Sequence, residues 1–242
     1  MTKGLLFSCL CAIFLFTNAV AYPAVRPIAT LSIGGDYENT PSNSKNIVLL
    51  SPFFNSYLSG GHDWKTVAGL FMGGEFSLLS CFLGQLGLSY YQNQPYTLKG
   101  SVYEFGSPSF NNLAFQYSVK SQRIMLDSKF LTTYRQRFHP FITLGAGEAI
   151  NRSYDYVEIP VDTTGVSTAQ PFQSHTCHSF TYALGFGLDV DIDQHFRGGV
   201  AYRFVDLGAT GLGPSPSQVS SQTINYSHLR VSQFLAQISY LL

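Results

Sequence analysis

The chain has 242 residues, and its 14 basic and 14 acidic side chains cancel, so that only 12% of its residues are charged, about half of the roughly 25% found in soluble globular domains. Aromatic residues nevertheless reach 15%, and the mean hydropathy is only +0.08. This balance excludes a basic nucleic-acid binder and argues against a disordered chain, and it predicts a surface that contacts something other than water.

The first 21 residues have the pattern of a secretory signal peptide. A basic residue, Lys3, precedes an apolar run and a small-x-small site, which is the order that export signals require. The residues of the predicted cleavage site are Ala19, Ala21 and Tyr22. We expect residues 1–21 to be removed and residues 22–242 to form one domain. No later apolar run reaches the about 18 residues of a transmembrane helix, so strands must make any membrane crossing.

Large apolar residues alternate with small or polar residues in eight segments. A period of two indicates a β-strand with two different faces. In the clearest case, 180–190, every even position is large and apolar, and every odd position is small or acidic. The predicted strands are 27–37, 64–77, 82–92, 113–135, 140–152, 180–190, 196–204 and 234–242.

Short and long connections alternate between these strands. Short turns fall near 78–81, 136–139 and 191–195, and long polar segments occupy about 38–63, 93–112, 153–175 and 208–227. Outer-membrane barrels have this asymmetry, with short periplasmic turns and long extracellular loops. An even number of strands also closes the sheet without an unpaired edge in lipid. We therefore predict an all-β fold, an eight-stranded antiparallel up-and-down transmembrane β-barrel.

Three questions about the fold arise at this point. The apolar segment 46–58 fits a ninth and tenth strand, a hairpin extension of the first loop above the membrane, or a loop packed on the rim, so ten strands is the structural alternative. The alternation within 113–135 changes near Ser121 to Arg123, which indicates a bulge or the exit of the strand from the apolar band. A soluble lipocalin-like barrel would expose a face rich in Lys and Glu, whereas Gly, Ala, Ser, Thr and Gln dominate here.

Charged residues on the polar faces predict a network inside the barrel. Eight strands leave a bore just wide enough for side chains, so we expect paired charges that plug the interior and no open pore. Glu148 is assigned to the interior on the reading that the even positions of 140–152 face inward. The predicted network comprises Lys65, Glu75, Arg123, Asp127, Lys129, Arg135, Glu148, Asp189, Arg197 and Arg203.

Two short motifs lie in the second half of the chain. Residues 198–208 read GGVAYRFVDLG, and residues 139–147 read HPFITLGAG. Both resemble the small outer-membrane β-barrel family that includes opacity-type surface antigens and the OmpA-like transmembrane domain. The resemblance implies an integral protein of the Gram-negative outer membrane, surrounded by outer-membrane lipid and inserted by the outer-membrane assembly machinery. The family's insertion signal ends in an aromatic residue, whereas this chain ends in Leu242.

The leading functional interpretation is a noncatalytic, porin-like barrel that displays four surface loops for a structural or adhesive role. Its partners would be lipid and an extracellular or host ligand, with no nucleic acid and no cofactor. Exposed aromatic side chains are typical adhesive anchors. The loop candidates are Tyr96, Tyr103, Phe105, Phe110, Tyr154, Tyr156 and Phe172.

A lipid-modifying enzyme and a small solute channel are the functional alternatives. The enzyme would need a nucleophile, a base and an acid within hydrogen-bond reach. The candidates are Ser179, His175, His178 and His228, with Asp155, Glu158 and Asp206. A metal site at His175, Cys177 and His178 is not expected, because alternate facing separates His178 from the other two. Cys81 and Cys177 are predicted to lie at opposite ends of the barrel, too far apart for a disulfide.

Overall fold

Eight antiparallel strands close into a ring in the computed structural model, which describes residues 25–38, 43–50, 52–60, 62–79, 81–161, 172–215 and 221–242. In order around the ring they are β1 (Arg26–Glu38), β4 (Trp64–Leu79), β5 (Phe82–Asn93), β7 (Asn111–Thr132), β8 (Phe138–Pro160), β9 (His175–Asp191), β10 (Phe196–Asp206) and β13 (Arg230–Leu241). β13 pairs with β1 and closes the barrel. The predicted eight-stranded fold is confirmed. The signal-peptide site at Ala19, Ala21 and Tyr22 lies outside the described residues.

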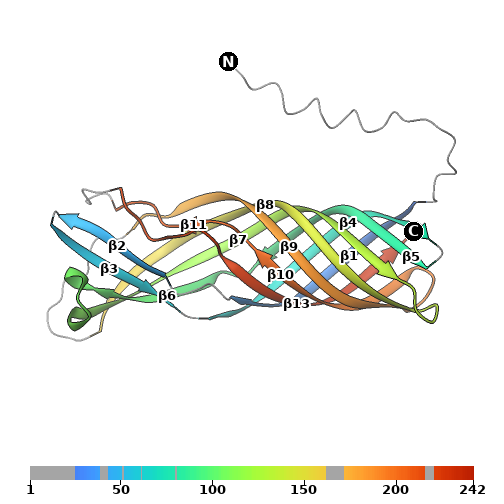
Figure 1. Ribbon diagram of the computed structural model, residues 1–242, viewed down its shortest axis with the longest axis horizontal. Coiled ribbons are helices and arrows are strands. Elements are labelled where there is room, and N and C mark those ends of the chain that lie inside the picture. Colours follow the sequence, from blue (N-terminus) through green and yellow to red (C-terminus); the bar gives the residue numbers. More distant parts are fainter. Residues whose placement is uncertain are drawn as a thin grey trace, which may run out of the picture.

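Three further strands extend the sheet beyond one end of the ring. β6 (Tyr96–Tyr103) pairs with the first half of β7, β3 (Phe53–Ser59) pairs with β6, and β2 (Asn43–Leu50) pairs with β3. Segment 46–58 is therefore part of a hairpin above the ring and adds no ring strand. Figure 1 shows β2 and β3 at the end of the barrel opposite the carboxyl terminus. Short elements nearby are η1 (Glu104–Gly106), η2 (Pro108–Phe110), β11 (Thr210–Gly211) and β12 (Asn225–Tyr226).

The outer face of the ring is an apolar belt between two aromatic zones. Short turns mark the periplasmic end, so the long connections and the β2–β3 hairpin are extracellular. Exposed belt residues include Leu31, Ile33, Met72, Leu88, Leu126, Ile142, Phe186 and Val200. Exposed aromatic residues lie at the periplasmic strand ends, at Phe82, Tyr134, Phe138, Phe196 and Tyr240, and toward the other end at Trp64, Tyr90, Phe180 and Tyr182. Such a surface fits lipid with two interfaces. Among the described residues, no helix has the length and apolar character to cross a bilayer.

Polar and apolar side chains change sides along β7. Its odd residues face inward over its whole length. From residue 123 onward the inward side chains are mostly polar, and the outward ones, such as Leu126, are apolar. Before residue 120 the inward side chains are Leu113, Phe115, Tyr117 and Val119, and the outward ones are mostly polar. The predicted parity change at 121–123 is thus no bulge: it is the point where the strand leaves the lipid belt.

A true bulge occurs higher on the neighbouring strand. Asp155 has a φ of 55°, and the β7–β8 register shifts between Gln116 and Ser118. An extra residue in one strand reverses the faces of the residues that follow it. Odd residues of β8 face inward up to Ser153, whereas beyond the bulge Tyr156 and Glu158 are the more buried ones. The bulge therefore directs these two side chains toward the axis.

We predict that a charge on the outward face of β7 is costly only within the belt. Leu126→Arg is expected to lower the free energy of unfolding in lipid vesicles by about 2–4 kcal/mol, the cost of a lipid-facing arginine near the midplane. Ser118→Arg, on the same face beyond the belt, is expected to cost about 0–1 kcal/mol. Denaturant titration of the two refolded variants measures both values, and equal losses would contradict the assigned membrane boundary.

Candidate functional site

Two guanidinium groups pack against one aromatic ring inside the barrel. The Tyr91 ring centroid lies 4.5 Å from Cζ of Arg123 and 4.9 Å from Cζ of Arg203. Arg203 donates to both carboxylate oxygens of Asp127, at 2.9 and 3.2 Å, and to the Tyr91 hydroxyl at 2.6 Å. All four residues are buried. Buried charges are tolerated in this way only when they are paired and hydrogen-bonded.

A second layer of ion pairs lies toward the periplasmic end. Arg197 donates to Glu75 at 2.6 Å and to Asp191 at 2.8 Å. Lys129 lies 2.9 Å from Asp189 and 4.1 Å from the Phe141 ring centroid. His139 of β8 completes the layer by contacting Asp191 at 2.8 Å. The sequence analysis does not indicate His139, because it places residues 136–139 in a short turn.

Glycine makes room for these carboxylates. A Cβ atom on Gly145 would lie 1.9 Å from Oδ1 of Asp127, and one on Gly199 would lie 2.0 Å from Oδ1 of Asp189. The void beside Lys129 and Arg203 has a volume of about 40 Å³, far below the about 300–1,000 Å³ of ligand-binding cavities. The middle of the bore is therefore filled by paired side chains.

Three residues of the predicted network lie elsewhere. Lys65 lies at the extracellular rim, where it pairs with Asp63 at 2.8 Å. Arg135 lies in the periplasmic turn with a φ of 49°, beyond the last inward position of β7. Glu148 faces outward, with 62% of its side chain exposed, and pairs with His178 at 2.7 Å. Its assignment to the interior is wrong because the odd positions of this part of β8 are the inward ones.

The extracellular end of the barrel is a folded head with its own apolar core. We use the term extracellular head for β2, β3, β6, the upper parts of β7 and β8, and the described residues of 172–174 and 207–229. Its aromatic core joins Tyr57, Phe115, Tyr156 and Phe172, with ring centroids 5.0–6.1 Å apart between neighbours. The composition of the long polar segments gives no signal for a core of this kind.

A carboxylate is enclosed in this aromatic core. The hydroxyl groups of Tyr156 and Tyr57 donate to Glu158 Oε1 at 2.5 and 3.3 Å. Burial, reinforced by the negative charge of Glu158, raises the pKa of both tyrosines above the usual value. Of the predicted adhesive anchors, Tyr96, Tyr156 and Phe172 thus pack the head.

Three phenylalanines remain exposed at the tip of the head. Phe105 is 58% exposed, and its ring centroid lies 5.7 Å from that of Phe53 and 6.0 Å from that of Phe110. Phe105 also has a φ of 53°, a conformation that costs a residue with a side chain about 1–2 kcal/mol. We call Phe53, Phe105 and Phe110 the aromatic tip. Clustered, exposed aromatic rings of this kind mark contact surfaces.

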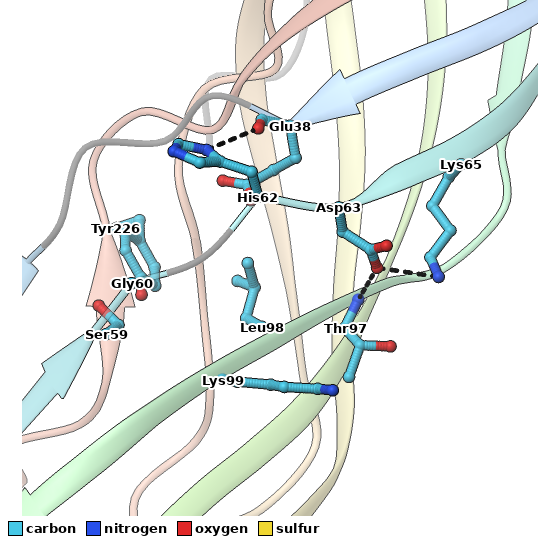
Figure 2. Close-up of a pocket in the computed structure, with 10 residues that line it drawn as sticks. All are labelled: Glu38, Ser59, Gly60, His62, Asp63, Lys65, Thr97, Leu98, Lys99 and Tyr226. Atoms are coloured by element: carbon cyan, nitrogen blue, oxygen red, sulfur yellow. Dashed lines mark hydrogen bonds and ion pairs between the residues drawn. The ribbon is translucent and has the colours of Figure 1, made fainter.

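A polar pocket of about 240 Å³ lies at the base of the head, between the end of β1, the β3–β4 connection and β6 (Figure 2). The Asp63 carboxylate accepts from the Thr97 amide at 3.3 Å and from Lys65. Partial burial raises the pKa of Asp63, but these hydrogen bonds outweigh it and hold the pKa below its usual value. Figure 2 shows Tyr226 on the side of the pocket opposite Lys65. The pocket is smaller than the about 300–1,000 Å³ of typical ligand sites, so it admits a single sugar ring or one protruding side chain.

The candidate catalytic residues lie on different faces of the wall. Ser179 is on the inward-facing parity of β9 and donates to the Ala209 carbonyl at 3.1 Å, whereas His178 faces outward. His228 and Asp206 contact each other at 2.9 Å. The predicted facing of β9 is confirmed, since His175 Nδ1 lies 3.3 Å from Cys177 Sγ on the face opposite His178. Cys81 lies in the β4–β5 turn, at the other end of the barrel from Cys177.

We predict that buried and exposed ion pairs of this barrel differ in their contribution to stability. Asp127→Ala leaves the buried Arg203 without its carboxylate and is expected to cost about 3–5 kcal/mol. Glu148→Ala removes only the exposed pair with His178 and is expected to cost about 0–1 kcal/mol. Equilibrium unfolding of the refolded variants in lipid vesicles measures the difference, and equal costs would be inconsistent with the described network.

Comparison with solved structures finds outer-membrane barrels. The outer membrane protein OprG from Pseudomonas aeruginosa aligns with 12% identity over 90% of this chain and 97% of its own, at a TM-score of 0.47. Neisserial surface protein A aligns with 12% identity over 88% of this chain and 96% of its own, at a TM-score of 0.44. The outer membrane protease OmpT from Escherichia coli aligns with 11% identity over 91% of this chain and 98% of its own, at a TM-score of 0.42.

No protein-family model and no curated protein sequence matches the chain. Its assignment therefore follows from its own geometry: a closed ring of eight strands, an apolar belt between aromatic zones, and short turns that join consecutive ring strands at the periplasmic end. The chain is an integral β-barrel protein of the bacterial outer membrane.

Proposed function

We propose that this protein is a noncatalytic outer-membrane barrel that makes adhesive contact with a surface outside the cell through its extracellular head. The aromatic tip is the observation that carries the proposal. Exposed aromatic rings on a rigid support are the usual anchors of protein interfaces, and these three are held by the β2–β3 hairpin and the β6–β7 connection.

The support of the tip favours recognition over a purely structural role. A mobile loop loses side-chain freedom when it binds, at about 0.5–1.5 kcal/mol for each side chain. The tip is attached to a head whose aromatic core is packed beneath it, so a ligand meets rings that are already ordered. The polar pocket at the base of the head offers a second contact to a sugar or a side chain of the same ligand.

Two observations favour this function over the alternatives. A triad enzyme needs a base within hydrogen-bond reach of its hydroxyl, whereas the Ser179 hydroxyl donates to the Ala209 carbonyl and contacts none of the described histidines. A solute channel needs a continuous water path, whereas paired charges around Tyr91 fill the middle of the bore.

Substitution of the tip tests the proposal. Cells that display the protein are expected to adhere to cultured epithelial cells and to immobilised matrix proteins. The double variant Phe105→Ser/Phe110→Ser is expected to reduce adhesion at least tenfold, because a central aromatic anchor contributes about 2 kcal/mol or more. Val157→Ser removes an exposed apolar side chain of the same head outside the tip and is the matched control.

The outcomes separate the functional classes. Unchanged adhesion of the double variant, at equal surface expression, would overturn the role of the tip. A change in acyl-chain mass when the refolded protein is incubated with lipid A or phospholipid would instead support an enzyme. Steady conductance in a planar bilayer would support a channel.

A further inference from the structure

A groove on the outer wall of the barrel runs from the lipid belt to the extracellular boundary. It has a volume of about 710 Å³. Its lower part is lined by belt residues, among them Leu31, Ala68 and Leu70, and its upper part by Gln92, Lys120 and Tyr154. One end of the groove is therefore apolar and the other polar. A lipid of the adjoining leaflet has the same order, with its acyl chains at the level of the apolar end and its headgroup at the level of the polar end.

The groove exists because the wall changes strands at this point. β5 ends at Asn93 and β6 begins at Tyr96, so Gln94 and Pro95 interrupt the strand that pairs with β7. These residues line the groove with the start of β4, and the Gln94 amide donates to the Thr66 carbonyl at 2.8 Å. The hollow is thus a fixed feature of the paired wall.

Two cations lie side by side at this level of the wall, and one of them, Lys120, lines the polar end of the groove. Lys120 of β7 and Arg152 of β8 are directly opposite each other in the register, and both belong to the outward-facing residues of their strands. Like charges in that position destabilise a sheet. No described carboxylate lies within ion-pair distance of either, although the Arg152 guanidinium lies 5.7 Å from the Tyr154 ring centroid. An anion bound between them would remove the repulsion.

The height of this pair identifies the source of the anion. Along the outward face of β7, the belt residues Leu126 and Ile124 are followed by Gln122 and then Lys120. Gln122 is the first polar residue above the belt on this face, and Lys120 is the next outward residue. Lys120 therefore lies at the level where lipid headgroups meet water.

We propose that the groove is a binding site for one lipid with an anionic phosphate headgroup. The phosphate lies between Lys120 and Arg152, and an acyl chain lies along Ala68 and Leu70. This site is independent of the adhesive role of the tip, because the tip is at the far end of the head.

Native mass spectrometry of the full-length refolded barrel tests the proposal. The protein is released from nanodiscs of phosphatidylcholine with phosphatidylglycerol, and the retained lipids are counted. The wild type is expected to retain one phosphatidylglycerol in preference to phosphatidylcholine. Lys120→Gln and Arg152→Gln are each expected to weaken that retention about fivefold, the contribution of one basic side chain at an anionic surface.

Two variants make the test specific. Lys45→Gln removes one positive charge from the β2–β3 hairpin, away from the groove, and is expected to retain phosphatidylglycerol like the wild type. Ala68→Trp fills the apolar end without changing the charge and is expected to reduce retention; a site for a free anion would be unaffected. The heat-dependent shift of a folded barrel on gel electrophoresis confirms that each variant is folded.

The proposal would be overturned by several results. The first is no preference of the wild type for phosphatidylglycerol. The second is an equal loss in Lys45→Gln and Lys120→Gln, which would reduce the effect to net charge. The third is full retention by Ala68→Trp, which would show that headgroup attraction operates without the groove.

Discussion

Lipid provides no hydrogen bonds to a polypeptide backbone, and this constraint determines the rest of the structure. Each N–H and C=O within the bilayer must pair with a neighbouring strand, so the sheet closes on itself when β13 meets β1. A ring of eight strands has a narrow bore. Charged residues at inward positions must therefore pair, and small residues must make room for them, as Gly145 does beside the Asp127 carboxylate that pairs with Arg203.

The boundary between lipid and water reverses the chemistry of a strand that continues through it. Within the belt, the apolar face of β7 meets lipid; above it, the outer face meets water and the apolar face turns to the axis. The two interiors are joined by hydrogen bonds: Arg123 donates to Asn93 at 3.0 Å, Asn93 to the Tyr96 hydroxyl at 2.6 Å, and Tyr96 to Asp36 at 2.5 Å. The head is thus a continuation of the barrel wall.

Alternation in the sequence predicted the ring strands because the belt imposes a strict period of two. It could not give the pairing of the charges, which depends on register between strands distant in sequence, as for Arg203 and Asp127. It failed at Glu148 because one charged residue was used to set the facing of a strand whose Ile142 and Leu144 face lipid. The core of the head was missed because its partners, such as Tyr57 and Phe172, come from segments that carry no alternation of their own.

Continuity of the wall also determines how the tip is presented. β7 and β8 run without interruption from the lipid belt into the head, so the orientation of the head is fixed relative to the bilayer by the same hydrogen bonds that close the ring. The Asp155 bulge turns Tyr156 inward to pack against Phe172, and Tyr57 of β3 packs against the same ring. The hairpin that carries Phe53 is thereby anchored to the barrel. The closure that satisfies the backbone in lipid thus also preorganises the rings that face the exterior.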